Sequence, residues 1–322
     1  MHAPIAQPED ITSSLGRQAA AFRRDGILVL RQVFAGTELA DLRRRAQAVK
    51  DRAMAAGVDG MRFWYRGSVK ADELPAGAER MPYSWGVNEI TRPELFDPVL
   101  ISTLGHPRLD PVLNVLLDRP RAWGLKMLWA PRASAYDLHW HRDIDGHLDP
   151  VVPYKPEAND HLQFNAALEP DDSFIAVPGS HRRAMTAAEQ RLIHADSRCE
   201  LPGQVRVVLE PGDIVVMDAH AIHRGSAVPG APRLSLHYSC QAQWVPLCAW
   251  GGEHFTWIIS DAFIDRLSPA TRPYYLRLRE AARAATQHDW MVEHARRQGF
   301  TGRLDSPWPG TVKAGKSRQY TA

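Results

Sequence analysis

The sequence predicts a mainly β protein with flanking helices, an α+β chain whose strands form a sandwich or a barrel. From about residue 121, short β-like runs follow one another, separated by turns rich in proline and glycine. Helical spacing of apolar residues occurs before this region and again after about residue 260. We therefore expect one domain over 1–322, with a helical part and lid loops at 1–120, a β core at 121–260, and helices and a tail at 261–322.

Three stretches predict the main helices. The apolar residues of one stretch recur at helical spacing, and Gly57 is a plausible end; they are Leu39, Leu42, Ala46, Val49 and Ala53. In "DPVLNVLLD", Asp110 is expected to cap a second helix and Pro111 suits its first turn. A third helix is expected within "PYYLRLREAARAATQHDWMVEHARR". Residues 58–90, between the first two helices, are irregular and rich in aromatics.

The strands of the core are predicted from short β-rich runs. In "EPGD", Pro211 and Gly212 occupy the two central positions of a type II turn. The predicted strands are "RAWGLKMLWA" (121–130), "HLQFNAAL" (161–168), "SFIAV" (173–177), "QVRVVL" (204–209), "DIVVMDA" (213–219), "RLSLHYSC" (233–240) and "HFTWII" (254–259).

Composition excludes several classes of protein. Hydrophobic residues make up 44% of the chain and charged residues 24%, and the net charge is +2, so no nucleic-acid partner is expected. No apolar stretch reaches the roughly 18 residues of a membrane-spanning helix, and the start shows no secretory signal. Three cysteines without a CxxC pair fit a reducing cytoplasm, where we place the protein. The oligomeric state is not readable from the sequence.

The short stretch "HWHRD" (139–143) is a candidate half of a metal site. His141 and Asp143 are two residues apart, so on a strand they point to the same face, about 6–7 Å apart at the backbone. His139 has the same parity and competes for the role. A second histidine must come from a distant strand, and His220 or His223, after "DIVVMDA", can supply it.

Two histidines and one carboxylate form the facial triad of non-haem Fe(II) oxygenases, which leaves three positions open on an octahedral ion. Those positions suit a bidentate 2-oxo acid and dioxygen. The far carboxylate of such a co-substrate needs a fork of N–H donors. Arg233, ten residues after His223, can provide it, and Ser226 or Ser235 can add a hydroxyl.

Several stretches together resemble the phytanoyl-CoA dioxygenase-like group of Fe(II)- and 2-oxoglutarate-dependent oxygenases. They are "RRDGILVLRQVF" (23–34), "HWHRD", "FIAVPGSH" (174–181) and "LEPGDIVVMDAHAIHRGSAVPGAPRLSLHYS" (209–239), and the resemblance covers roughly residues 20–245. It implies a double-stranded β-helix core of the jelly-roll, cupin-like kind. One departure is "DDS" before the "PGSH" strand, where the group often has Asn-Gly.

The resemblance also implies roles for particular residues. It makes His141, Asp143 and His223 the iron ligands, because His139 is followed two residues later by a histidine rather than a carboxylate. Arg233 becomes the clamp for 2-oxoglutarate, while His181 of "PGSH" is expected to be structural. Further contacts to 2-oxoglutarate are expected from Ser235, Ser226, Asn165 and Met127, whereas Lys126, of opposite parity to Met127, is expected to point elsewhere.

The substrate residues are harder to read. Aromatic and charged side chains that precede, flank or follow the metal motif are candidates, with packing over the barrel mouth as the alternative role. These candidates are Trp64, Tyr65, Arg66, Tyr83, Trp85, His139, Asp145, His147 and Trp244.

The resemblance implies an oxidoreductase that uses Fe(II), 2-oxoglutarate and O2 to hydroxylate, or otherwise oxidise, an unactivated C–H bond of a small molecule, with release of succinate and CO2. Specialised metabolism is a plausible setting. Two alternatives remain open: a cupin-type metal enzyme that does not use 2-oxoglutarate, and a non-catalytic small-molecule-binding protein. Arg233 argues against the first, and retention of all three ligands argues against the second. The retained Asp143 also disfavours halogenation.

Overall fold

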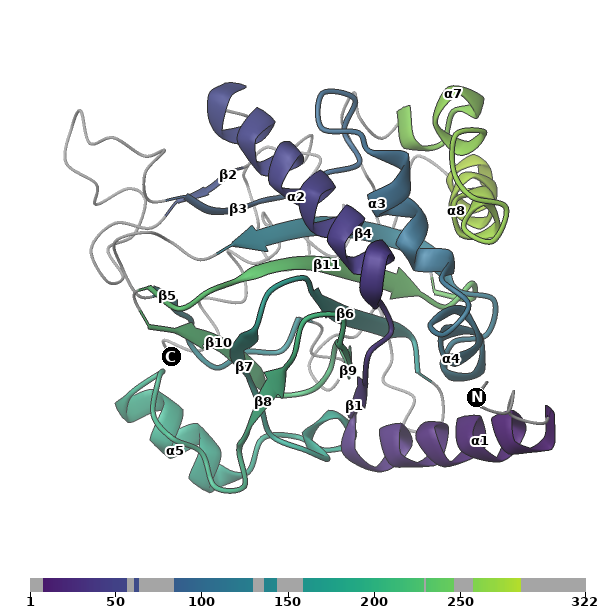
Figure 1. The fold of residues 1–322 in the computed structure, drawn as a ribbon. Helices are drawn as coiled ribbons and strands as arrows, with labels where there is room; N and C mark the ends of the chain where they lie inside the picture. Colours follow the sequence, from purple (N-terminus) through teal and green to yellow (C-terminus); the bar gives the residue numbers. More distant parts are fainter. Residues whose placement is uncertain are drawn as a thin grey trace, which may run out of the picture.

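A computed structural model describes residues 8–56, 61–63, 84–129, 136–143, 159–228, 230–245 and 257–284. The strands form two antiparallel sheets (Figure 1). The seven-stranded sheet has the order β1 (Ile27–Leu30), β9 (Ile214–Asp218), β6 (His161–Ala167), β11 (Leu234–Gln241), β4 (Arg121–Trp129), β3 (Ser84–Val87) and β2 (Met61–Phe63). The four-stranded sheet has the order β5 (Tyr136–Asp137), β10 (His223–Ala227), β7 (Asp171–Ala176) and β8 (Val205–Leu209).

The eight strands from β4 to β11 are divided equally between the sheets, four in each. Strands β4, β6, β9 and β11 lie in one sheet, and β5, β7, β8 and β10 lie in the other. This distribution of eight strands over two facing sheets is the jelly-roll arrangement. The predicted fold class, mainly β with flanking helices, is therefore confirmed.

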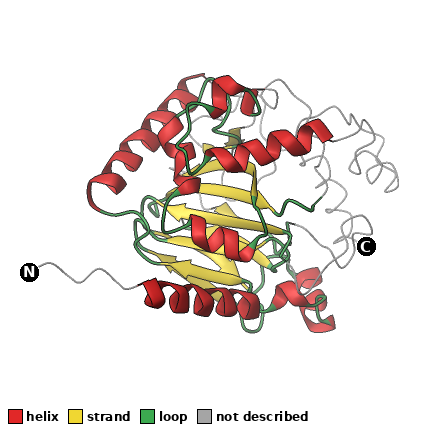
Figure 2. Cartoon of the chain, turned by 90° about the vertical axis from the view of Figure 1, so that its right-hand side faces the viewer, coloured by secondary structure: helices red, strands yellow, loops and turns green. Residues whose placement is uncertain are grey.

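Most helices pack on the face of the seven-stranded sheet that points away from the four-stranded sheet, the outer face (Figures 1 and 2). Helix α1 (Pro8–Asp25) packs against β1 and the helix at Asp110–Leu116, whereas α5 (Ala187–Ala195) lies beside the four-stranded sheet. The largest apolar cluster joins this outer face to helical residues such as Leu42, Leu113 and Leu278. The helices are α1 (Pro8–Asp25), α2 (Gly36–Ala56), α3 (Pro98–Ser102), α4 (Asp110–Leu116), α5 (Ala187–Ala195), α7 (Asp261–Ile264) and α8 (Arg272–Ala284), with short 3-10 turns η3 (Thr103–Gly105) and η4 (Ser180–Arg182).

The register of the strands decides which side chains point into the space between the two sheets. We call the face of each sheet that points into this space the inner face. Directly paired residues of antiparallel strands point to the same face. Val215 and Met217 pack with residues of the four-stranded sheet and so mark the inner face. Asn165 pairs with Val215 and with His237, which places all three on it.

Most predicted elements are confirmed, with several differences. Residues 58–90, expected to be irregular, contain strands β2 and β3, and helices α3 and α7 were not predicted. The run "HFTWII" was wrong as a strand, because its described residues, 257–259, are helix and turn. Asp110 is the first residue of α4 and not its cap, which is Leu109. Helices α1 and α5 were not foreseen, although Thr186 and Glu189 form a capping box that announces α5. The division into one domain with the stated boundaries stays a prediction.

The predicted "EPGD" turn holds the first strand region against the sheet. The N–H of Asp213 donates to the carbonyl of Glu210, and Gly212 has φ +96°, as a type II turn requires. The N–H of Phe34 donates to the Gly212 carbonyl at 3.1 Å. A Cβ at Gly212 would lie 2.1 Å from the carbonyl oxygen of Phe34. Glycine is therefore required both by the turn and by this close approach.

Among the described helices, none combines the length and the hydropathy that crossing a membrane requires.

We predict that Gly212→Ala lowers the free energy of unfolding by more than about 2 kcal/mol, because strain at positive φ adds to the backbone overlap. Gly203→Ala is a matched control, since Gly203 has φ +74° but open space around a new Cβ, and only the strain of about 1–2 kcal/mol is expected. Urea denaturation of both variants measures the difference. Equal losses would show that the Phe34 contact relaxes freely.

Candidate metal centre

Two segments about eighty residues apart in the sequence are joined by backbone hydrogen bonds at one end of the inner face. The N–H of His141 donates to the carbonyl of His223 at 3.0 Å, and the N–H of His223 donates to the carbonyl of His141 at 2.9 Å. The N–H of Asp143 donates to the carbonyl of Ala219 at 3.0 Å. The backbone thus fixes all three predicted ligands relative to one another before any side chain is considered.

The three side chains converge. One donor atom each from His141, Asp143 and His223 lies within 4.8 Å of the others. The Nε2 atom of His223 is 3.4 Å from Oδ2 of Asp143, and the two imidazole rings are 4.3 Å apart at their centroids. Donors about 2.1 Å from one ion lie roughly 3–4 Å apart, so a small side-chain adjustment would gather these three around a metal. His223 is 6% exposed, whereas His141 and Asp143 are half-buried, so one side of the triad is open to solvent or a ligand.

Both imidazoles are held in the tautomer that a metal ligand needs. Nδ1 of His141 lies 2.8 Å from the carbonyl oxygen of His139, and Nδ1 of His223 lies 3.0 Å from that of Ala221. A carbonyl only accepts, so each Nδ1 must carry the proton and each Nε2 carries the lone pair. Hydrogen bonds of this kind are typical partners of metal-bound histidines. The donor set therefore fits a divalent iron ion.

The two competing histidines have other roles. His139 has an exposed side chain and contributes its carbonyl to His141 rather than its ring to the triad. His220 is buried, and its Nε2 lies 2.8 Å from Asp160. Burial disfavours the imidazolium, but the hydrogen bond with Asp160 and the charge of Asp218 outweigh it, so the pKa of His220 is raised. Because Nε2 of His220 is hydrogen-bonded to Asp160, this atom does not point to the triad.

Arg233 lies at the other end of the inner face. Its Nε donates to Oδ2 of Asp171 at 3.0 Å, and both side chains are almost completely buried, at 4% and 3% exposed. Asp171 belongs to the four-stranded sheet and Arg233 precedes β11 in the seven-stranded sheet, so the ion pair connects the two sheets. The pair fixes the direction of the guanidinium within the jelly roll.

Two further predicted residues share this face. Asn165 and Ser235 are buried, at 7% and 0% exposed, and face inward by register. Neither Oδ1 of Asn165 nor Oγ of Ser235 has a hydrogen-bond partner within the described part of the chain. Buried polar atoms without partners are rare and point to a ligand or an ordered water. Both residues therefore fit a polar co-substrate.

The placement of Met127 and Ser226 corrects two predictions. Met127 pairs with Leu236 on the outer face and packs in the helix-side core, so it does not line the pocket. Ser226 alternates with inward-facing Gly225 and pairs with Asp137 on the outside of the four-stranded sheet. Lys126, expected to point elsewhere, pairs with His237 and faces inward. Strand parity was correct in each case, but the sequence does not reveal which parity faces inward.

A polar stripe on the inner face near the metal ligands was not predicted from the sequence. In β6, His161 and Gln163 alternate with apolar Leu162 and Phe164, and they are 0% and 4% exposed. Nε2 of His237 on the neighbouring strand lies 2.9 Å from Oε1 of Gln163. The signal was present in "HLQFNAAL", where every second residue up to Asn165 is polar although the strand is buried.

His161 is placed close to the triad by the backbone. Its carbonyl accepts from the N–H of Ala219, whose own carbonyl accepts from Asp143. Within the described part of the chain, neither ring nitrogen of His161 has a hydrogen-bond partner. Trp123 packs edge-on against the ring, with the centroids 4.1 Å apart. Burial lowers the pKa of His161 to about 3, so its imidazole is neutral.

Most of the predicted substrate residues lie outside the described residues. Of the three that are described, His139 is exposed, as stated above, and Trp244 is 38% exposed after β11. Trp85 is buried, but it alternates with Gly86 and so shares the outward parity of Val87, which lies in the helix-side core. The candidates outside the described residues are Trp64, Tyr65, Arg66, Tyr83, Asp145 and His147.

Comparison with known proteins agrees with this geometry. The family model "Phytanoyl-CoA dioxygenase (PhyH)" matches residues 22–233. Ectoine dioxygenase of Sphingopyxis alaskensis is 23% identical over 230 residues, which is 64% of this chain and 69% of that protein. A crystal structure of EctD from S. alaskensis with 2-oxoglutarate and 5-hydroxyectoine superimposes with a TM-score of 0.54 at 22% identity, covering 72% of this chain and 77% of that one.

The carbocyclase SnoK from nogalamycin biosynthesis, described as a non-heme alpha ketoglutarate dependent enzyme, superimposes with a TM-score of 0.50 at 20% identity, covering 70% of this chain and 83% of its own. These likenesses confirm the jelly-roll fold. The family model spans most of the chain, including all three residues of the triad and Arg233. The resemblance inferred from the motifs is thereby confirmed, and the chain belongs to the phytanoyl-CoA dioxygenase family.

Proposed function

We propose that this member of the family, an Fe(II)- and 2-oxoglutarate-dependent dioxygenase, hydroxylates an unactivated C–H bond of a small polar molecule. The observation that carries the proposal is the triad of His141, Asp143 and His223, with both histidines held in the tautomer that presents Nε2. Two nitrogens and one carboxylate oxygen on one side of an ion leave the other side open for co-substrate and O2.

In this proposal His141, Asp143 and His223 hold the iron. When bound, Fe(II) and 2-oxoglutarate supply the oxidising chemistry, with succinate and CO2 as products of the co-substrate. The carboxylate of Asp143, next to Nε2 of His223, offsets part of the positive charge in a buried site. The protein's part is to hold the three ligands in place and to fix where the substrate C–H bond lies.

Arg233 is proposed to bind the far carboxylate of 2-oxoglutarate. About five residues of β7, roughly 16 Å of strand, separate Ala176, which pairs with His223, from Asp171, which pairs with Arg233. An arginine side chain and a five-carbon diacid together can cover this span. Asn165 and Ser235, with their unsatisfied oxygen atoms, support the same position, and inward-facing Lys126 adds a cation to this face.

The polar stripe of His161, Gln163 and His237 favours a substrate with hydrogen-bonding groups over a bare hydrocarbon chain. A neutral imidazole offers one donor and one acceptor, and both need partners when buried. EctD, a structural relative, has been crystallised with 5-hydroxyectoine, a small polar molecule, which is consistent with this choice. The loop residues Trp64, Tyr65, Arg66, Tyr83, Asp145 and His147 stay predicted substrate contacts, and a cytoplasmic location stays a proposal from the cysteine content.

We predict that Arg233→Lys raises the KM for 2-oxoglutarate about tenfold to a hundredfold, because a lysine keeps the charge but loses the planar fork. Succinate formation in the presence of Fe(II) and O2 measures the effect. Arg224→Lys is the matched control, since Arg224 is also buried and paired with an aspartate, Asp137, but on the outer face of β10.

Two results would decide against the proposal. Absence of succinate formation by the wild-type protein, with His141→Ala indistinguishable from it, would exclude 2-oxoglutarate chemistry. Metal-dependent turnover that is indifferent to Arg233→Lys would favour a cupin-type enzyme that does not use 2-oxoglutarate.

We predict that His161→Leu keeps or increases the free energy of unfolding of the metal-free protein at neutral pH, because it removes a buried imidazole whose nitrogens have no hydrogen-bond partner among the described residues, a cost of about 1–3 kcal/mol. His220→Leu is the control with the opposite sign, since it leaves the buried Asp160 unpaired. Urea denaturation of the two variants against wild type makes the comparison. A loss in His161→Leu as large as that in His220→Leu would indicate a structural role for His161.

The same variant predicts a pH effect. Because the folded pKa of His161 is about 3 against an ordinary value of 6.5, the unfolded chain binds the extra proton between these values. The free energy of unfolding of the wild type therefore falls as the pH drops below 6.5, by about 1.4 kcal/mol per pH unit. The wild type should show this slope in excess of His161→Leu, as measured by denaturation at several pH values between 6.5 and 4.

A further inference from the structure

Arg142 stands between two of the proposed iron ligands, His141 and Asp143, but its side chain occupies a different environment. Neighbouring side chains of an extended segment point to opposite sides, so Arg142 points away from the side that carries the triad. It is 2% exposed. Burial of a guanidinium is unfavourable unless its donors are satisfied, so its hydrogen bonds indicate its role.

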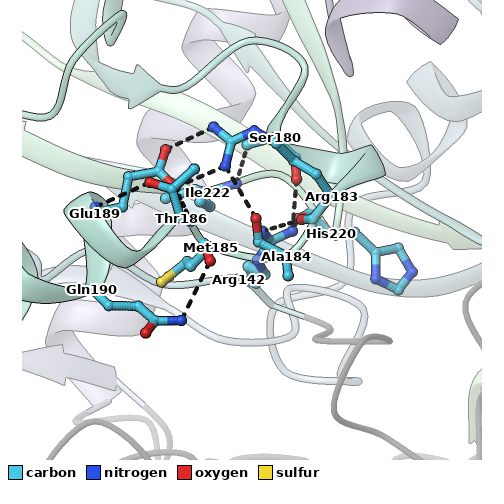
Figure 3. A network of polar contacts seen from close by, with 10 residues as sticks. All are labelled: Arg142, Ser180, Arg183, Ala184, Met185, Thr186, Glu189, Gln190, His220 and Ile222. Carbon is cyan, nitrogen blue, oxygen red and sulfur yellow. Dashed lines mark hydrogen bonds and ion pairs between the residues drawn. The ribbon is translucent and has the colours of Figure 1, made fainter.

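The guanidinium of Arg142 donates to three backbone carbonyls (Figure 3). Nη1 donates to Ser180 at 2.9 Å and to His220, and Nη2 donates to Arg183 at 2.8 Å. His220 lies three residues before the ligand His223, whereas Ser180 and Arg183 belong to the loop that begins with "PGSH". One side chain thus connects three segments: the first pair of ligands, the "PGSH" loop and the approach to the last ligand.

Ser180 completes the connection from the other side. Its Oγ accepts from the N–H of Ile222 at 2.8 Å, and the residue is 0% exposed. Residues 219–222 are therefore held at the His220 carbonyl by Arg142 and at the Ile222 N–H by Ser180. The residue between these two contacts is Ala221, whose carbonyl orients the ring of His223. A shift of this short loop would turn a ligand as well as move it.

The "PGSH" loop is itself anchored. Arg183 forms two hydrogen bonds of 2.7 Å with the carboxylate of Glu189, and that carboxylate also accepts from the N–H of Thr186 at 2.7 Å (Figure 3). The Oγ1 atom of Thr186 accepts in turn from the N–H of Glu189, which closes the cap of α5. The carbonyls of Ser180 and Arg183, which accept hydrogen bonds from Arg142, therefore belong to a segment that further hydrogen bonds hold in place.

We infer that Arg142 is a positioning residue for the metal centre, because it fixes residues 219–222 and thereby the place and orientation of His223 relative to His141 and Asp143. The inference rests on the proposed iron site. The planar fork spreads its donors over separate nitrogen atoms in fixed directions, so that Nη1 and Nη2 reach different carbonyls, whereas an ammonium group has all three donors on one atom. The arginine therefore has a geometric role that a buried positive charge alone would not fill.

The test measures metal binding without turnover, with Co(II) alone as the probe in place of Fe(II). Visible absorption of bound Co(II) reports ligand geometry, and competition with a chelator gives the dissociation constant. Arg142→Met is expected to raise that constant about tenfold to a hundredfold and to alter the spectrum, as loss of groups that orient metal ligands does. Arg142→Lys should fall between Arg142→Met and wild type.

Two further variants separate positioning from general stability. Arg272→Met removes an arginine that likewise donates to two backbone carbonyls, of Leu267 and Asp265, far from the triad, and should lower the melting temperature without changing Co(II) binding. Ser180→Ala removes only the acceptor for Ile222 and should also weaken Co(II) binding, so it keeps the test decisive if Arg142→Met does not fold.

Unchanged Co(II) affinity and spectrum in Arg142→Lys and Ser180→Ala would overturn the inference, and so would changes no larger than those in Arg272→Met. Failure of the wild-type protein to bind Co(II) more tightly than Asp143→Asn would be a different result. It would remove the metal centre, and the positioning role would fall with it.

Discussion

The reciprocal hydrogen bonds between the backbones of His141 and His223 are the constraint on which the rest of the site depends. They join segments that the sequence separates by about eighty residues, and they do so only because the jelly roll places β5 and the residues after it beside β10. Once these backbones are paired, Asp143 can face His223 and the three donor atoms converge. Each histidine then needs only a carbonyl two residues upstream to set its tautomer.

The sequence revealed the parity of the site and the nature of its ligands, but not its inner and outer faces. His141 and Asp143 were predicted to act together because a spacing of two puts them on one side of a strand. The same rule could not decide between Met127 and Lys126, since β4 carries apolar side chains on both faces, Leu125 beside Met127 and Leu128 beside Lys126. The decision needed the pairing with β11, a long-range fact. Helix α5 is different, because its capping box was legible in the sequence and was overlooked.

The space between the two sheets contains polar side chains suited to binding a ligand, at positions where apolar side chains would pack better. The inner face carries His161, Gln163 and Asn165 in one strand, where apolar side chains would stabilise a sandwich more. The outer face of the same strand is apolar and joins the helix-side core through Leu162 and Phe164. Strand β6 therefore presents polar groups to the pocket on one face, while its other face contributes to stability by packing against the helix-side core.

The first strand ties the beginning of the chain to the metal end of the sheets. The carbonyl of Gly26 accepts from the N–H of Asp218, and the carbonyl of Asp25 accepts from the N–H of Gly179. The ring of His181 lies so close to Gly26 that a Cβ there would be 2.4 Å from its Nδ1. Residues 23–26 thus pack against the "PGSH" loop and support it. A deletion from the start of the sequence that removed residues 23–26 would therefore disturb the loops around the metal ligands, although the first ligand lies more than a hundred residues further along the sequence.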